Sequence, residues 1–169
     1  RQAISVLVEV LQDGNQEPMV RHEAGEALGA IGASEAITVL EKYIDDPIVE
    51  VAETCQLALE RIRWLQSPDK LQRESPYTSV DPAPPAVATS VESLKDTLLD
   101  ENVSLFERYR AMFALRNIKN KEAVLALCTA LTCGSALFKH EVAFVLGQLQ
   151  DPLSVPYLKG SLEDEHENE

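Results

Sequence analysis

The sequence has few aromatic residues and no long hydrophobic run. Phe, Trp and Tyr make up 5% of its 169 residues, and Val and Ile rarely alternate with polar residues. This composition argues against β-sheets, which favour aromatic and β-branched residues in alternating patterns. The longest apolar stretch, 123–133, is about half of the ~20 residues that a transmembrane helix needs. We therefore expect no membrane span.

Cysteine is also scarce. Cys55, Cys128 and Cys133 are an odd number of cysteines, and no two of them have the CxxC spacing of many zinc and redox sites. This usage fits reduced thiols better than a disulfide framework. We interpret the three cysteines as packing residues and expect a cytoplasmic protein.

Basic residues are outnumbered by acidic ones. The sequence has 28 Asp and Glu against 15 Lys and Arg, which gives a formal net charge of −13. Such a charge repels phosphate backbones, which argues against nucleic acid as a partner, and it attracts cationic ligands or basic protein surfaces.

The apolar residues recur at spacings of three and four, which predicts an all-α fold. Gly32, Asp46-Pro47, Cys133-Gly134 and Asp151-Pro152 separate the helical segments. The predicted helices cover residues 2–11, 19–31, 34–44, 48–65, 91–99, 105–118, 121–131, 136–149 and 153–162.

The helices form a repeat. A shift of 31 residues places Ala27-Leu28 on Ala58-Leu59, and the same shift places Ala114-Leu115 on Val145-Leu146. A period of this length made of two helices predicts a HEAT-like α-solenoid of helical hairpins. An uncapped repeat end would allow self-association.

Five of the nine prolines fall between two groups of predicted helices. Prolines at this density prevent helix continuation and favour an extended chain. We predict N-terminal HEAT-like repeats at 1–65, a proline-rich linker at 66–90, C-terminal HEAT-like repeats at 91–163 and an acidic tail at 164–169.

Two His-Glu pairs occupy the same repeat position. His22-Glu23 and His140-Glu141 each lie ahead of similar apolar segments, whereas His166 lies in the acidic tail without a helical pattern. Projection at about 100° per residue places His22 opposite the apolar face of its helix. It predicts that His22 points away from its own hairpin core.

Small residues accompany both histidines. Gly25 and Gly29 lie three and seven residues after His22, and Ala143 and Gly147 have the same offsets from His140. Glycine inside a helix costs about 0.5 to 1 kcal/mol, so something that needs close approach should offset the loss. Imidazole and carboxylate together suit iron or another first-row metal. The alternative is that the His-Glu pairs are surface pairs and the glycines only let hairpins pack closely.

Four segments resemble the deoxyhypusine hydroxylase family. They are RHEAGEALGAIG at 21–32, SVDPAPP at 79–85, FERYRAMFALRN at 106–117 and CGSALFKHE at 133–141. The resemblance implies a HEAT-repeat monooxygenase in two halves, with a di-iron centre between them. It implies Fe(II)- and O₂-dependent hydroxylation of the deoxyhypusine residue of the translation initiation factor that bears hypusine, completing hypusine synthesis.

The resemblance also assigns residues. It implies that His22, Glu23 and His140 are metal ligands and that Glu141 binds the substrate amine. Family members carry four His-Glu motifs, and this sequence matches the inner two, so we expect an internal fragment that carries half of the metal site.

Two non-oxidative functions are alternatives. A non-catalytic acidic HEAT-repeat scaffold could bind a basic protein segment with the same helices and no metal. A HEAT-like lyase or chaperone of a tetrapyrrole-binding protein has no pigment pocket in the sequence to support it.

Overall fold

A computed structural model describes residues 2–68, 76–88 and 90–167. The chain divides into two compact units, Arg1–Pro84 and Pro85–Glu169. Within the described residues the regular structure is entirely helical, which confirms the all-α prediction. No helix in these ranges is long and apolar enough to cross a membrane.

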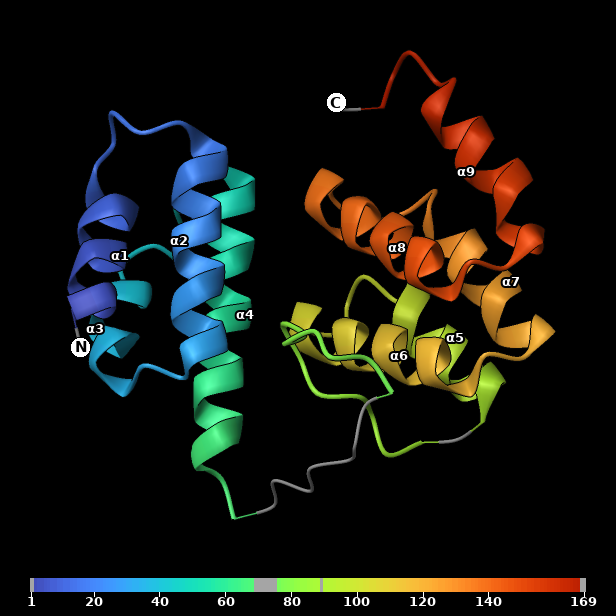
Figure 1. Ribbon diagram of the computed structural model, residues 1–169, viewed down its shortest axis with the longest axis horizontal. Coiled ribbons are helices and arrows are strands. Elements are labelled where there is room, and N and C mark those ends of the chain that lie inside the picture. The colour runs from blue at the N-terminus through green and yellow to red at the C-terminus, as the bar shows by residue number, and fades with distance from the viewer. Residues whose placement is uncertain (1, 69–75, 89, 168–169) are drawn as a thin grey trace. The chain divides into compact units, whose positions relative to one another are not determined.

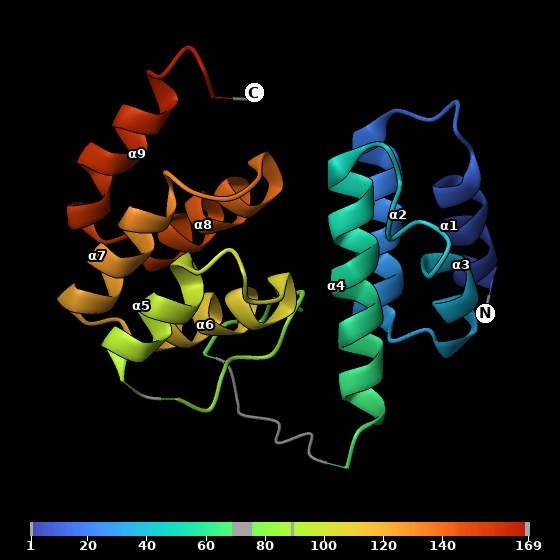
Figure 2. The same cartoon turned by 180° about the vertical axis from the view of Figure 1, so that it is seen from behind.

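The first unit is a two-layer stack of helices (Figures 1 and 2). Its elements are α1 (Gln2–Gln12), α2 (Pro18–Ile31), the 3-10 turn η1 (Ser34–Ala36), α3 (Ile37–Leu40) and α4 (Val49–Gln66). The helices α2 and α4 lie side by side, α1 packs on α2, and α3 packs on α4. The core between the layers includes Leu11, Leu28, Leu40, Val51 and Ile62.

The second unit repeats this arrangement. Its elements are α5 (Val91–Leu99), α6 (Leu105–Ile118), α7 (Lys121–Ala130), α8 (Ala136–Leu149), the 3-10 turn η2 (Pro152–Ser154) and α9 (Val155–Leu162). The helices α6 and α8 contact each other, α5 packs on α6, and α7 contacts both α6 and α8. α2 and α6 correspond end to end with an offset of 87 residues, and α4 and α8 begin at the same offset.

Capping residues explain most of the helix starts in the second unit. The side chains of Ser90, Ser104, Asn120 and Ser135 accept hydrogen bonds from backbone N–H groups three residues ahead. These bonds satisfy donors that a helix start leaves without a partner.

The predicted helix at 34–44 is wrong in length. The residues form η1 and then only four α-helical residues, followed by turns up to Ile48. Ala33 precedes η1 and offers no side-chain cap, whereas Asn120 caps the much longer α7. The turns also bring Asp46 into the interior of the unit, where its side chain is only 4% exposed.

The predicted linker falls partly outside the described residues, because 69–75 and 89 are not described. α4 ends at Gln66, and the described residues 76–88 contain no helix. Of the predicted acidic tail, residues 164–167 are described, and Glu167 forms an ion pair with Lys139 of α8. The predicted domain boundaries remain predictions.

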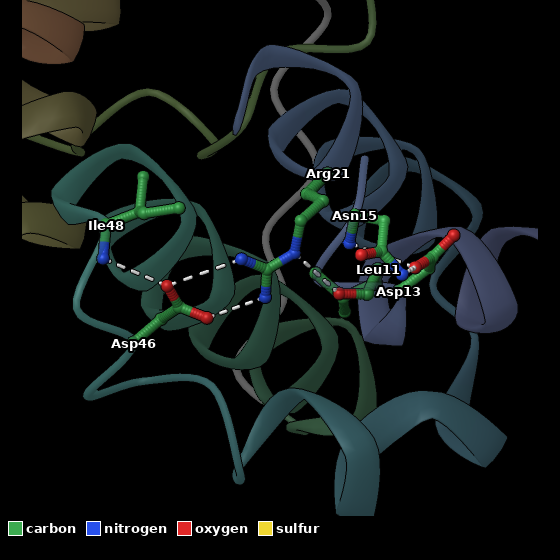
Figure 3. A network of polar contacts seen from close by, with 6 residues as sticks. All are labelled: Leu11, Asp13, Asn15, Arg21, Asp46 and Ile48. Carbon is green, nitrogen blue, oxygen red and sulfur yellow. Dashed lines mark hydrogen bonds and ion pairs between the residues drawn. The ribbon is translucent and has the colours of Figure 1, made fainter. Parts of the chain in front are cut away.

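A buried arginine fixes the corner between α1 and α2 (Figure 3). Arg21 Nε donates to the carbonyl oxygen of Leu11 at 2.9 Å, and Arg21 Nη2 lies 2.6 Å from Oδ2 of Asp46. In the turn between the helices, Asp13 Oδ1 accepts the backbone N–H of Asn15 at 3.0 Å. The guanidinium thus joins α1, α2 and the turn that precedes α4.

The second unit has the same corner with one difference. Arg108 Nε donates to the carbonyl oxygen of Leu98 at 3.0 Å, and Asp100 Oδ1 accepts the N–H of Asn102 at 2.9 Å. Arg21 meets Asp46 25 residues further along, whereas the same offset from Arg108 leads to Cys133. Arg108 Nη2 is buried and has no hydrogen-bond partner among the described residues.

Candidate metal centre

His22 is buried between α2 and α4. Only 6% of the residue is exposed, and its Nδ1 lies 2.5 Å from Oγ1 of Thr54 on α4. The prediction that His22 points away from the core of its own hairpin is wrong, because the ring is buried against α4. The projection treats α2 as a helix with one packed face, and α4 covers a second face.

The glycines of α2 allow this close packing. A β-carbon on Gly29 would lie 2.9 Å from both Cα and Cβ of Ala58, and a β-carbon on Gly25 would lie 3.0 Å from Cγ2 of Thr54. Gly147 of α8, at the repeat position of Gly29, has no atom within 4 Å of the same point. In the first unit, the glycines therefore let α2 and α4 pack closely against each other. This agrees with the alternative stated above, in which the glycines serve the packing of hairpins.

Glu26, rather than Glu23, approaches the imidazole. Oε2 of Glu26 lies 3.7 Å from Nε2 of His22, because residues four apart share a helix face. Glu23 is exposed, and adjacent helical residues point about 100° apart. The structure therefore brings His22 to a carboxylate, but not to the one that the sequence pair indicates.

His140 lies on the exposed side of α8. It lines a pocket of about 430 Å³ with Lys139 and Ala143 of α8 and Leu158 and Leu162 of α9. Glu141 is half-buried and interacts with neighbouring groups. His140 thus faces an open pocket of the second unit that apolar side chains and the Lys139–Glu167 ion pair line together.

The residues around His22 fit a metal ion only in part. Among the described residues, no group of three or more His, Cys, Asp or Glu side chains is placed to hold one. His22 Nε2 and Glu26 Oε2 are a nitrogen and an oxygen donor on one helix face, a pairing that first-row metals accept. This donor pair is a partial fit, and further ligands would be needed.

Two residues beside His22, Glu26 and Thr54, were not predicted from the sequence. Glu26 could have been found, because its i+4 spacing from His22 places the two side chains on one face. Thr54 could not, because it belongs to a different helix and approaches His22 only through the packing of α2 on α4.

The cysteines are confirmed as packing residues in two of three cases. Cys55 and Cys128 are buried, and Cys133 is half-buried. Burial, with a smaller contribution from the Asp46 charge, raises the pKa of Cys55 to about 12. Burial also raises the pKa values of Cys128 and Cys133. Thiols that stay protonated are poor nucleophiles and poor metal ligands.

Family comparisons identify the repeat class. The family model for HEAT repeats matches residues 1–60, and the family model for the PBS lyase HEAT-like repeat matches residues 107–133. Each match falls in one unit, which confirms the prediction of HEAT-like hairpins in both.

Whole-chain comparisons are more specific. The chain is 58% identical over 169 residues to deoxyhypusine hydroxylase of Drosophila melanogaster, covering 99% of this chain and 56% of that protein. It is 60% identical over 168 residues to the Gallus gallus protein of the same name, with the same coverage. The chain therefore spans little more than half the length of these relatives.

A solved structure agrees with the sequence comparisons. The structure of human deoxyhypusine hydroxylase in complex with glycerol matches with a TM-score of 0.93 and 59% identity, covering 99% of this chain and 58% of that one. Identity of this degree over nearly all of the chain is specific to one family rather than to HEAT repeats in general. The chain belongs to the deoxyhypusine hydroxylase family.

Proposed function

We propose that this chain is part of a cytoplasmic deoxyhypusine hydroxylase and contributes to the iron- and O₂-dependent hydroxylation of the deoxyhypusine residue of a translation initiation factor. The observation that supports the proposal is the 58% and 60% identity, over 99% of the chain, to proteins that bear this name. The net charge of −13 suits a substrate residue that carries amines.

In this proposal His22, Glu23 and His140 are iron ligands. Iron, when bound, supplies the activation of O₂. The burial of His22 supports its assignment, because packing and the Thr54 contact hold the ring in one orientation. His140 is accessible for ligation from the pocket that it lines.

Glu141 has a different role in the proposal. Its carboxylate binds an amine of the deoxyhypusine side chain through a charge-assisted hydrogen bond. Such a contact orients the substrate without taking part in the oxidation.

Iron retention after anaerobic loading with Fe(II) tests the proposal. His22→Ala and His140→Ala should each lower the iron retained by the chain, and His166→Ala, which changes the exposed histidine of the acidic tail, should not. The proposal would be contradicted if the unaltered chain retained no iron. It would also be contradicted if all three variants retained as much iron as the unaltered chain. Those results would favour the acidic HEAT-repeat scaffold that binds a basic protein segment.

A second pair of variants identifies the carboxylate ligand. If Glu23 is the ligand, Glu23→Gln should lower iron retention more than Glu26→Gln. The opposite order would transfer the role to Glu26, whose Oε2 is 3.7 Å from the imidazole.

A further inference from the structure

The hydrogen bond between His22 and Thr54 joins two helices in the interior of the first unit. Both residues are more than nine-tenths buried, with 6% and 3% of their surfaces exposed. The contact joins His22 Nδ1 to Thr54 Oγ1 at 2.5 Å, across an interval of 32 residues. A buried polar pair of this kind is costly to break, because each group would lose its partner without gaining water.

This contact distinguishes the two ring nitrogens. Nδ1 is occupied by the threonine hydroxyl, whereas Nε2 lies 3.7 Å from the Glu26 carboxylate, beyond hydrogen-bond distance. When Nδ1 donates its proton to the threonine oxygen, Nε2 keeps a lone pair that can be given to a metal ion, and it faces the Glu26 carboxylate as a second donor.

Thr54 is itself held in place by the α2 glycine beside it. Its Cγ2 methyl group would lie 3.0 Å from a β-carbon on Gly25, so the absence of that carbon makes room for the methyl. A β-branched side chain has few χ1 rotamers in a helix, and fixing the methyl group also fixes the hydroxyl. The hydroxyl is thus directed at His22 by packing.

We propose that Thr54 is a positioning residue for His22: its hydroxyl holds Nδ1 and leaves Nε2 as the metal-binding nitrogen beside Glu26. Metal-bound imidazoles generally donate their other N–H to an oxygen acceptor, which fixes the tautomer and the ring plane. A threonine hydroxyl can accept this proton. The metal-binding part of the inference rests on the proposed function, whereas the positioning part does not.

The first test uses the metal-free chain. In ¹⁵N-histidine NMR spectra at about pH 8, where imidazole is mostly neutral, Thr54→Val should change both ring-nitrogen signals of His22, because valine keeps the shape and lacks the hydroxyl. Thr54→Ser keeps the hydroxyl but lacks the methyl group that fixes it, and should change the signals less than Thr54→Val does. Thr129→Val is the matched control, because the Thr129 hydroxyl donates to the Leu125 carbonyl of its own helix.

Identical His22 signals in the unaltered chain and Thr54→Val would overturn the proposal. If Thr54→Val does not fold, Thr54→Ala provides the same comparison without the added methyl group.

The second test measures Fe(II) binding. Loss of a group that orients a metal-bound histidine typically weakens metal binding about 10- to 100-fold. We expect this change in Thr54→Val and a smaller loss in Thr54→Ser, which keeps the hydroxyl without the methyl group that fixes it. Equal affinities for the unaltered chain and Thr54→Val would overturn the metal-binding part. An unaltered chain that binds no Fe(II) would count against the proposed function, and the metal-free spectra would still decide whether Thr54 holds Nδ1.

Discussion

Arg21 Nη2 lies 2.6 Å from Oδ2 of Asp46, and the two side chains are only 6% and 4% exposed. Removal of the carboxylate would leave a buried guanidinium without its counter-charge. We expect Asp46→Ala to lower the free energy of unfolding by about 3 to 5 kcal/mol in urea titrations. Asp45→Ala is the matched control, because Asp45 is exposed, and should stay within about 0.5 kcal/mol. Similar losses in both variants would contradict the buried-pair account.

The same pair predicts an acid-sensitive stability. Burial raises the pKa of Asp46, but hydrogen bonds from Arg21 and from the Ile48 N–H, with the Arg21 charge, outweigh it and bring the pKa below its ordinary value of 3.8. A carboxyl group whose pKa is lower in the folded state stabilises the fold above its unfolded pKa. The stabilisation should be complete at neutral pH and should disappear as the pH falls below 3.8. Urea titrations between pH 7 and 2 should show Asp46→Asn approaching the unaltered chain at low pH, and a constant difference would contradict this origin.

Two glycines at one repeat position should respond in opposite ways to alanine. In Gly29→Ala the new methyl group meets the backbone of Ala58 at 2.9 Å, so α2 and α4 must separate, at a cost of about 1 to 3 kcal/mol. In Gly147→Ala it meets nothing within 4 Å, and the better helix former should add about 0.5 to 1 kcal/mol. Thermal unfolding of the two variants measures both effects. A stabilised Gly29→Ala would show that the α2–α4 contact is not as close as described.

A substitution at Cys133 can give Arg108 the carboxylate partner that Arg21 has in the first unit. Burial raises the pKa of the Cys133 thiol, and the charge of Arg108 acts against this increase. Cys133→Asp would supply the carboxylate that Asp46 supplies to Arg21, and should raise the free energy of unfolding by roughly 1 kcal/mol at neutral pH. Cys128→Asp, at a buried site near Asp151, should be strongly destabilising. A loss of stability in Cys133→Asp would show that Arg108 does not accept a carboxylate there.

Much of the helical fold could be predicted because its signals are local. The bounds of α5, α6 and α8 agree with the spacing of apolar residues, and each of these helices begins after a capping serine. α3 could not be predicted, because its length depends on turns that bring Asp46 to an arginine on another helix.

The candidate site was less predictable. His22 could be chosen by its repeat position, but its burial depends on α4 and on the missing β-carbons of Gly25 and Gly29. The contact with Thr54 follows from this packing and has no local signal in the sequence.

The two arginine corners have a consequence for the length of the chain between helices. Connections between helices usually tolerate insertions, because they lie on the surface and make few fixed contacts. Here Leu11 and Arg21 are joined by a hydrogen bond across ten residues, and Leu98 and Arg108 are joined across the same interval. One added residue in either turn would displace the guanidinium from its carbonyl acceptor. The number of residues in these two turns should therefore not vary. Insertions should be tolerated only in the other connections between helices.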